Sequence, residues 1–349
     1  MCERKPVFGG ICMKKLIAVI LLLCLLLPME VLAAGKVIYR GEITDRYPTS
    51  YTRVYSKMDK NSKSITALDP GSPVNITAVH PGYVEVVLSS GKTGYILRNR
   101  VDVTETVDPT TTPPYPVIHF PYYVEIDRNV EVKAEKDASS ETLSLLTAGA
   151  RVAVLGCEDG WIKLVHKRQY GYINSNDVSA ILPVAPDART AGEGEALAVF
   201  NSFYSDDKDR INNLKVACNF ISKTLQPGES MNFNKTVGPF NASNGYLKAF
   251  VLKKPSSADE GESDSEGYGG GSCQVSSSLW DTLIQLDGIT IQMRKPHGAN
   301  GIAYLPHGMD ASSGRDDLNL IFRNDYDFPV RIDASCHDLC LFVAIYKGE

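Results

Sequence analysis

The sequence has no cluster of basic residues, and its net charge at pH 7 is −5. The first 33 residues hold four of the 36 basic residues but only two of the 41 acidic ones, so the rest of the chain is more acidic still. Proteins that bind polyphosphates depend on Lys and Arg to neutralise phosphate charge. We therefore expect no nucleic-acid partner and favour an uncharged or mixed-charge ligand.

Cysteine is scarce after residue 33, and this low density excludes a small disulfide-rich scaffold. An odd number of cysteines in an exported chain leaves at least one thiol unpaired. Cys336 and Cys340 lie between two strand-like runs, and we predict that they form one disulfide at the base of a hairpin. The five cysteines after residue 33 are Cys157, Cys218, Cys273, Cys336 and Cys340.

Long apolar runs are scarce as well, and the clearest one lies near the N-terminus. Residues 16–27 follow Lys14 and Lys15, carry no charge and end before Pro28. A positive segment, a short apolar run and small residues at a cleavage point are typical of a secretion signal. We predict that residues 1–33 are a signal peptide, that they alone contact the membrane before cleavage, and that the mature protein is secreted. An uncleaved anchor is the alternative, although the run is shorter than the ~20 residues that span a bilayer.

Two segments, 50–105 and 126–180, repeat the same pattern. Short alternating runs separated by glycines are typical of strands in a small sheet or barrel. The internal repetition therefore predicts two similar all-β units. The matching pieces are residues 71–76 with 149–154, 82–83 with 160–161, and 94–96 with 171–173.

The repeated pattern of Gly-x-x-Val, Gly-Trp and Gly-Tyr-Ile resembles bacterial SH3 domains. We expect SH3-like barrels at residues 36–105 and 121–182, joined by a Pro/Thr-rich linker at 106–120. The resemblance implies modules that bind peptidoglycan or wall peptides and perform no chemistry. The chain shows no terminal sorting signal, so we expect these modules to hold the protein to the cell wall.

Four aromatic residues of these modules are candidates for ligand binding, because such rings can line a groove. Trp161 and Tyr172 are equally consistent with core positions. In the first copy Tyr83 stands where the second has Trp161. The candidates are Tyr83, Tyr95, Trp161 and Tyr172.

A second linker, at 183–195, leads to a C-terminal domain at 196–349. One helix is predicted over residues 212–225, with Leu214, Cys218 and Leu225 on its apolar face and Pro227-Gly228 as its stop. A second helix is predicted from Gln274 to the region of Gly288. One long helix before several strands favours an α+β domain with a mainly antiparallel sheet. Strands are predicted at 289–293, 302–305, 318–322, 330–334 and 341–346.

The second predicted helix begins in an unusual way, because three glycines at 269–271 precede Ser272 and Cys273. Ser272 is the predicted N-cap, which places Cys273 in the first turn. There the unsatisfied backbone N–H groups and the helix dipole favour a thiolate. No Gly-Lys-Ser/Thr follows, which excludes a phosphate-binding loop.

Several short motifs of this domain occur in one characteristic order: Phe203-Tyr204, Pro227-Gly228-Glu229, Phe233-Asn234, Val237-Gly238-Pro239, Gly245-Tyr246, residues 269–276, residues 294–297, Tyr304-Leu305-Pro306 and Asp310-Ala311. In this order they resemble the VanW family, over roughly residues 196–348. That family is named for its association with vancomycin-resistance gene clusters. The resemblance implies a cell-envelope context, without an established reaction.

Three residues of the domain suggest a site for amide hydrolysis or acyl transfer. Cys273 would be the nucleophile, His297 the general base and Asp310 the group that orients the imidazole. Gln274 and the backbone N–H of Cys273 would stabilise an oxyanion, with Arg294 in support. The order of Cys at a helix start, His later and an acid beyond resembles transglutaminase-like and papain-like enzymes. The expected substrate is an amide bond in peptidoglycan stem peptides.

Two alternatives stay open. In the first, the same residues are structural and the protein is a non-catalytic wall-binding protein connected with the response to glycopeptide antibiotics. In the second, Cys273, His297 and Asp310 bind Zn²⁺ with water as the fourth ligand. The chain has no Cys-x-x-Cys or His-x-x-x-His pair to support that metal site. We expect no cofactor.

Overall fold

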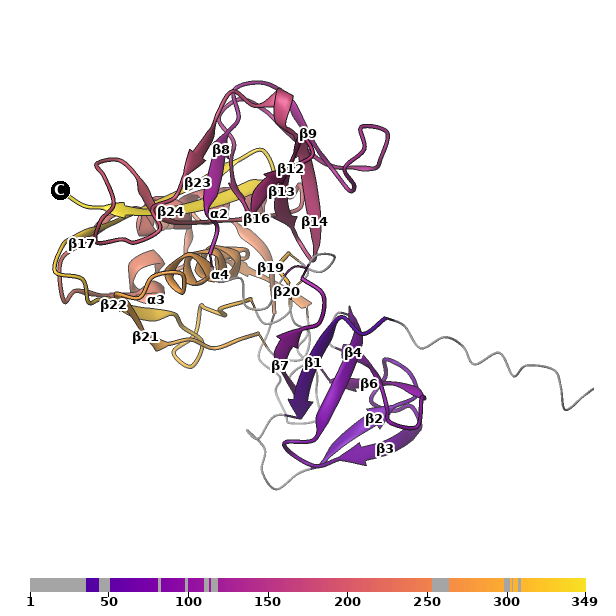
Figure 1. The fold of residues 1–349 in the computed structure, drawn as a ribbon. Helices are drawn as coiled ribbons and strands as arrows, with labels where there is room; N and C mark the ends of the chain where they lie inside the picture. Colours follow the sequence, from indigo (N-terminus) through magenta and orange to yellow (C-terminus); the bar gives the residue numbers. More distant parts are fainter. Residues whose placement is uncertain are drawn as a thin grey trace, which may run out of the picture.

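The computed structural model describes residues 36–43, 51–80, 83–97, 100–109, 113, 119–252, 264–297, 302, 304–306 and 309–349. The predicted signal peptide lies outside these residues, as does most of the linker between the two predicted β modules. Within the described ranges no helix is both long and apolar enough to cross a membrane. The chain forms two β units followed by a larger part that contains the helices (Figure 1).

The first β unit is one antiparallel sheet in the order β3-β2-β6-β5-β4-β1-β7. Alternate residues of β5 and β6 point inward, so Val84, Val86 and Ile96 are fully buried in its core. This core contains only residues of the first unit. Its strands are β1 (Tyr39–Ile43), β2 (Thr52–Tyr55), β3 (Ser64–Leu68), β4 (Pro73–His80), β5 (Tyr83–Val87), β6 (Thr93–Leu97) and β7 (Val101–Thr106).

The second β unit divides its strands between two antiparallel sheets, β10-β9-β14-β13-β12 and β11-β8-β15. Their pairing follows the first unit strand by strand, with β11 and β12 together in the place of β4. The strands are β8 (Tyr122–Glu125), β9 (Val130–Lys133), β10 (Thr142–Leu146), β11 (Arg151–Val154), β12 (Gly156–Glu158), β13 (Trp161–His166), β14 (Gln169–Asn174) and β15 (Ile181–Pro183). The short 3-10 turn η2 (Ser175–Asp177) separates β14 from β15.

The two units share details of packing as well as strand order. A Cβ atom added to Gly94 would lie 2.4 Å from Val54, and one added to Gly171 would lie 2.7 Å from Val132. Each glycine therefore allows the same close crossing of two strands. We call residues 39–106 the first repeat and residues 122–183 the second repeat. Their described strands form open sheets and do not close into the barrels that the SH3 resemblance implied.

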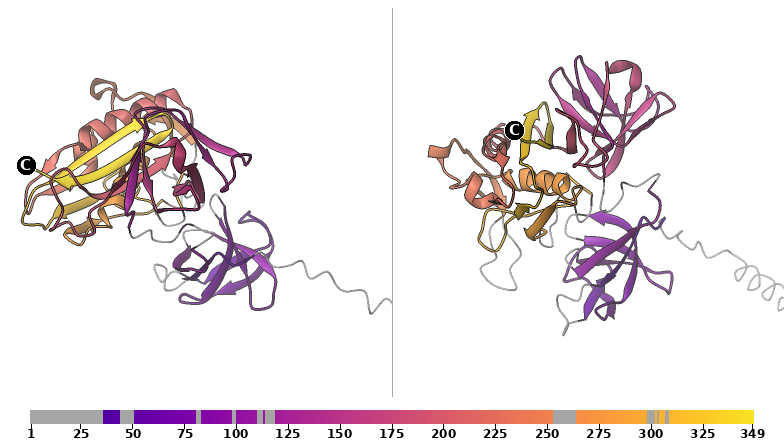
Figure 2. Two further views of the ribbon diagram at one scale, coloured as in Figure 1. Left: turned by 45° about the horizontal axis from the view of Figure 1, so that its top comes forward. Right: turned by 60° about the vertical axis from the view of Figure 1, so that its left-hand side comes forward.

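The second repeat differs from the first because it shares its core with the C-terminal part of the chain. Phe203 and Cys340 are buried among its apolar residues. At the same boundary, Arg151 forms an ion pair with Asp333 at 3.0 Å, and the Thr147 backbone N–H donates to the Asp338 carboxylate. Figure 2 shows the second repeat packed beside β24 and the first repeat as a more separate body.

The C-terminal part is an α+β arrangement built on the antiparallel sheet β16-β24-β23-β17 and the smaller sheet β18-β22-β21. Helix α4 lies between these two sheets, and α2 packs beside it against β23 (Figure 1). The helices are α2 (Lys208–Ile221), α3 (Phe233–Val237) and α4 (Ser272–Leu283), with the 3-10 turn η3 (Ala242–Asn244). The strands are β16 (Ala196–Phe203), β17 (Thr224–Leu225), β18 (Ser230–Asn232), β19 (Lys248–Leu252), β20 (Asp264–Tyr268), β21 (Ile289–Met293), β22 (Ile321–Asn324), β23 (Val330–His337) and β24 (Cys340–Lys347).

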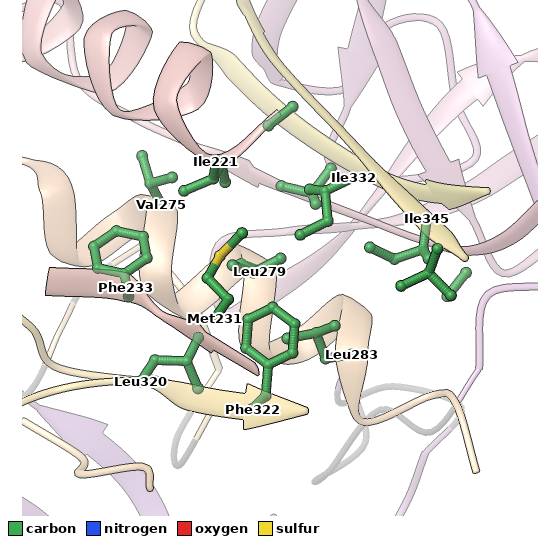
Figure 3. Packing of buried hydrophobic residues seen from close by; sticks show 14 of the residues in the cluster. Ile221, Met231, Phe233, Val275, Leu279, Leu283, Leu320, Phe322, Ile332 and Ile345 are labelled. Carbon is green, nitrogen blue, oxygen red and sulfur yellow. The ribbon is translucent and has the colours of Figure 1, made fainter. Parts of the chain in front are cut away.

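The apolar stripe of α4 fixes this helix in the middle of the domain. Val275, Leu279 and Leu283 are fully buried, and they pack against residues of both sheets and of α2 (Figure 3). Truncating a buried leucine of this kind to alanine costs about 2–5 kcal/mol. The prediction of the helix and of its buried face is confirmed, but the helix ends at Leu283 and not near Gly288.

The first predicted helix is shifted. It begins at Lys208 rather than at residue 212, because the Asp207 side chain accepts hydrogen bonds from the first backbone N–H groups. It ends at Ile221, well before Pro227-Gly228, and Leu225 belongs to β17. Leu225 is buried there as the helical spacing suggested, but a strand pairing with Val330 places it.

Three smaller predictions about elements are wrong. Ser272 is the first residue of α4 and not its N-cap, which is Gly271. None of the described residues within 302–305 lies in a strand; Ile302 and Leu305 are buried by side-chain packing alone. The predicted strand at 318–322 lies at Ile321–Asn324. The sequence patterns also missed α3 and the hairpin of β19 and β20.

The predicted disulfide between Cys336 and Cys340 is wrong, since both cysteines are free. In the hairpin of β23 and β24, Cys336 lies opposite Leu341 and Cys340 lies opposite His337. Successive residues of a strand point to opposite faces of the sheet. Cys340 therefore faces the second repeat, while Cys336 faces α2, where its sulfur is 3.6 Å from that of Cys218.

Candidate active site

The start of α4 presents Cys273 as the second residue of the helix. Gly271 has φ +108°, a backbone conformation that strongly favours glycine, and its α carbon lies against Arg210. No side chain caps the helix; the N–H groups of Ser272 and Gln274 donate to the carbonyls of Gly269 and Gly271, and the Cys273 N–H has no acceptor among the described residues. The dipole at this helix end stabilises negative charge close to the Cys273 sulfur.

His297 and Asp310 both lie in the connection between β21 and β22. The imidazole Nδ1 of His297 lies 2.8 Å from Oδ2 of Asp310, and the same oxygen accepts from the His297 backbone N–H. Both side chains are largely buried. This bond uses Nδ1 and leaves the other ring nitrogen for Cys273, whose thiolate and the His297 imidazolium stabilise each other.

The electrostatics of Cys273 favour the thiolate. Burial is the largest single influence and by itself raises the pKa of the thiol. The hydrogen bond and the charge of His297, together with hydrogen bonds to Ser313, outweigh burial and lower the pKa of Cys273 to about 6. The Ser313 hydroxyl donates to the sulfur at 3.5 Å. At neutral pH this site therefore holds a thiolate.

The two partners are shifted in the complementary directions. Burial opposes the charge on His297, but bonds to Asp310 and Cys273 raise the pKa of the imidazole to about 10. Burial likewise opposes the charge on Asp310, and His297 nevertheless lowers the pKa of that carboxyl to about 2. Between the pKa of Cys273, about 6, and that of His297, about 10, the three groups are a thiolate, an imidazolium and a carboxylate.

Serines of α4 connect the helix to the Asp310 segment. The Ser277 hydroxyl accepts from the Ala311 backbone N–H at 3.0 Å and donates to the Cys273 carbonyl at 2.7 Å. The Ser276 hydroxyl also donates to the Ala311 carbonyl. These bonds hold the residue after Asp310 directly against the turn that carries Cys273. The run of serines after Cys273 was a visible signal that the sequence analysis did not use.

Gln274 and Arg294 take supporting positions. The Gln274 amide donates to the Ser202 hydroxyl at 3.0 Å and to the Phe203 carbonyl at 3.2 Å, so its N–H groups hold α4 to β16. Arg294 Nε donates to the Asp310 carbonyl at 2.7 Å, and its guanidinium lies 4.2 Å from the Trp280 ring centroid. Among the candidate oxyanion donors, the backbone N–H of Cys273 is the one left without an acceptor among the described residues.

The four candidate aromatic residues of the repeats lie on inner strands of the sheets, β5 and β6 in the first repeat and β13 and β14 in the second. Glu85 lies opposite Tyr95, so Tyr83 and Tyr95 share one face of the sheet. Trp161 and Tyr172 occupy the equivalent positions. None of the four is fully buried. Tyr95 donates to the Glu85 carboxylate at 3.1 Å, and Tyr172 packs at the edge of the core shared with the C-terminal sheet.

Two further observations concern other kinds of site. In the described part of the chain, no group of three or more His, Cys, Asp or Glu side chains is placed to hold a metal ion. A hollow of about 520 Å³ is lined by Arg189 and residues 325–328. It lies beside Asp287, past the C-terminal end of α4, and its lining includes no nucleophile.

Comparisons with known proteins agree with this description of the C-terminal part. Residues 209–346 match the family model described as VanW like protein. The chain is also 31% identical over 157 residues to the uncharacterized protein YoaR of Bacillus subtilis (strain 168). That match covers 45% of this chain and 48% of YoaR, so it spans about half the length of the relative. The molecule is thus a two-repeat β protein with a VanW-like C-terminal domain.

Two solved structures were also matched, NlpC2 and NlpC1 from Trichomonas vaginalis. NlpC2 is 13% identical and NlpC1 is 11% identical, and the TM-score is 0.18 for each. The matches cover 54% and 91% of this chain and 58% and 96% of those chains. Similarity at this level supports no conclusion about fold or chemistry.

Proposed function

We propose that the VanW-like domain is an amide hydrolase or acyltransferase of the cell envelope, with Cys273 as its nucleophile. The observation that carries the proposal is the His297 imidazole, which is hydrogen-bonded to the buried Asp310 carboxylate and lowers the pKa of the Cys273 thiol. A cysteine with a purely structural role needs neither a neighbouring base nor a position in the first turn of a helix. Both lower the pKa of a thiol and are typical of cysteine nucleophiles.

In the first step, the Cys273 thiolate attacks the carbonyl carbon of the substrate amide. A carbon–sulfur bond forms, and the carbonyl oxygen becomes an oxyanion that the free backbone N–H of Cys273 stabilises. The carbon–nitrogen bond then breaks as the His297 imidazolium gives its proton to the leaving amine. The products are the free amine and a thioester on Cys273, with His297 neutral.

In the second step, neutral His297 accepts a proton from water or from an acceptor amine as that nucleophile attacks the thioester. The carbon–sulfur bond breaks and the thiolate leaves. Water gives a carboxylic acid, and an amine gives a new amide. Asp310 holds the imidazole in one orientation and stabilises its positive charge throughout.

We further propose that the substrate belongs to peptidoglycan, that the protein is secreted, and that the two repeats are SH3-like modules that bind wall peptides. The support is the sequence resemblance, together with the common strand order of the repeats and the matching positions of their aromatic side chains. An acidic chain without a basic cluster is consistent with a ligand other than anionic polymers.

The catalytic proposal is tested by turnover of purified cell-wall fragments. Cys273→Ala should abolish release of new amines or carboxylates, while Cys157→Ser, at an exposed free cysteine of the second repeat, should leave it unchanged. Fragments processed equally by wild type and Cys273→Ala would contradict the proposal. The remaining function would then be wall binding without catalysis.

The binding proposal is tested in the full chain, because the second repeat shares its core with the C-terminal sheet and cannot be deleted cleanly. Tyr83→Ala with Tyr95→Ala should weaken sedimentation with cell walls, as should Trp161→Ala with Tyr172→Ala. Tyr51→Ala, at an exposed tyrosine of the first repeat, is the control. Retention that none of these changes affects would refute the assigned binding faces.

A further inference from the structure

The charged groups around Cys273, apart from Arg210, are two negative and two positive ones. The thiolate and the Asp310 carboxylate face two positive groups, the His297 imidazolium and the Arg294 guanidinium. These four groups together carry no net charge. Arg210, in the first turn of α2, therefore adds one positive charge to the site.

The Asp207 carboxylate accepts from the backbone N–H of Arg210 and not from its guanidinium. Within the described residues, no carboxylate forms an ion pair with Arg210. Asp281, further along α4, is fully buried, and neither of its oxygens has a hydrogen-bond partner among the described residues. Burial raises the pKa of Asp281 well above its ordinary value and so disfavours its charged form. A half-buried arginine without an acidic partner calls for an anion from outside the protein.

The position of Arg210 directs its charge at the start of α4. Its side chain lies against Gly271, two residues before Cys273. Its described hydrogen bond is a long one, from Nη2 to Gln274 Oε1 at 3.5 Å. Most of the five guanidinium donors therefore have no acceptor among the described residues.

Tyr304 supplies a second unused donor at the same place. The Arg210 guanidinium lies 5.9 Å from the centroid of the Tyr304 ring. The Tyr304 hydroxyl oxygen is buried and has no hydrogen-bond partner among the described residues. Ser277 is close by, but its hydroxyl is already bonded to the backbone at Cys273 and Ala311. Burial first, and then the Cys273 thiolate, raise the pKa of Tyr304, so the phenol keeps its proton.

We propose that Arg210 and the Tyr304 hydroxyl, beside the N-terminal end of α4, bind a carboxylate of the substrate next to the amide that Cys273 attacks. The inference rests on the proposed function and adds the substrate class, which is a peptide with a free carboxylate close to the reacting bond. A guanidinium presents paired donors that match a carboxylate, and a buried phenol adds a third. A neutral peptide would leave these donors unpaired, so the site would discriminate against it.

The test compares two alkylating reagents of similar size at Cys273, the anion iodoacetate and the neutral iodoacetamide. The ratio of their rates, relative to the same ratio for free cysteine, reports binding of the carboxylate. Arg210→Gln should lower this ratio on the order of tenfold, the contribution of one hydrogen bond to a charged group, with the iodoacetamide rate little changed. Tyr304→Phe should lower the ratio less. Arg331→Gln, at an exposed arginine of β23, is the matched control.

Arg210→Lys keeps the charge and separates loss of binding from a folding defect; it should give an intermediate ratio. A ratio equal to wild type in Arg210→Gln would overturn the carboxylate site while leaving Cys273 reactive. Slow reaction of wild-type Cys273 with both reagents would instead overturn the proposed function and this inference with it. Acetate should also protect Cys273 from iodoacetamide in wild type but not in Arg210→Gln.

Discussion

Two cysteines of the C-terminal domain make a natural comparison, because both lie on helices and both are largely shielded from water. Cys273 is at the N-terminal end of α4, beside His297. Cys218 is in the last turn of α2, beside the sulfur of Cys336. The pKa of Cys273 is lowered to about 6, whereas the bond with Cys336 and then burial raise that of Cys218 well above its ordinary value.

The difference shows that burial alone does not determine how a cysteine behaves. Burial opposes the thiolate at both positions, but only Cys273 has a base that becomes positive. The two helix ends add to the contrast, since a dipole favours negative charge at its N-terminus and disfavours it at its C-terminus. Reactivity at Cys273 is therefore a property of its neighbours, and removing them should make it resemble Cys218.

The largest expected effect is in native-state labelling. At pH 7 iodoacetamide should modify Cys273 about a thousandfold or more faster than Cys218, because Cys218 reacts only when the core opens. Peptide mass spectrometry over time measures both rates in one sample. Similar rates for the two cysteines would show that the start of α4 does not activate its thiol.

A mild oxidant should distinguish Cys218 by a different reaction, the formation of a disulfide with its neighbour Cys336. Diamide should join Cys218 to Cys336, removing two protons and two electrons from the thiols as its azo bond is reduced to a hydrazine. The link closes a long loop and should stabilise the domain by about 2–4 kcal/mol in urea unfolding. Cys336→Ser should prevent the link and Cys340→Ser should not. A link between Cys336 and Cys340 would contradict the side-chain directions in β23 and β24.

A smaller effect is expected from Asp310→Asn. The amide keeps the shape of the carboxylate but removes the charge that raises the pKa of His297, so less imidazolium is present to stabilise the thiolate. The iodoacetamide rate of Cys273 at pH 7 should fall about tenfold. Asp333→Asn, which removes the partner of Arg151 instead, is the control. Equal rates in wild type and Asp310→Asn would show that Asp310 does not contribute to the activation of Cys273.

Part of this site was predictable from sequence because its signals are local. Glycines before Cys273 and an apolar residue at every turn after it predict a buried helix with the cysteine at its start. Alternation predicted β21 for the same reason, and the strands predicted at 330–334 and 341–346 lie within β23 and β24. The roles proposed for His297 and Asp310 stay predictions, although the structure brings both side chains to Cys273.

The rest depends on contacts between distant segments. Arg210, Ser313 and Tyr304 reach the site from a helix and a loop that carry no local pattern for it. The spacing of Leu225 fits a helix and a strand equally well, and only pairing with β23 decides between them. Cys336 meets Cys218 because the strand register turns it toward α2. The merged core of the second repeat likewise arises from long-range packing with Phe203 and Cys340.

The most direct test of the central claim is the rate of Cys273 alkylation by iodoacetamide against pH, in wild type and in His297→Ala. The thiolate reacts, so the rate should rise as pH increases through the pKa of the thiol, near pH 6 in wild type. Without His297 burial dominates, and the midpoint should move to the ordinary value of about 8.5 or above. A midpoint near or above 8.5 in both proteins would contradict activation of Cys273 by His297.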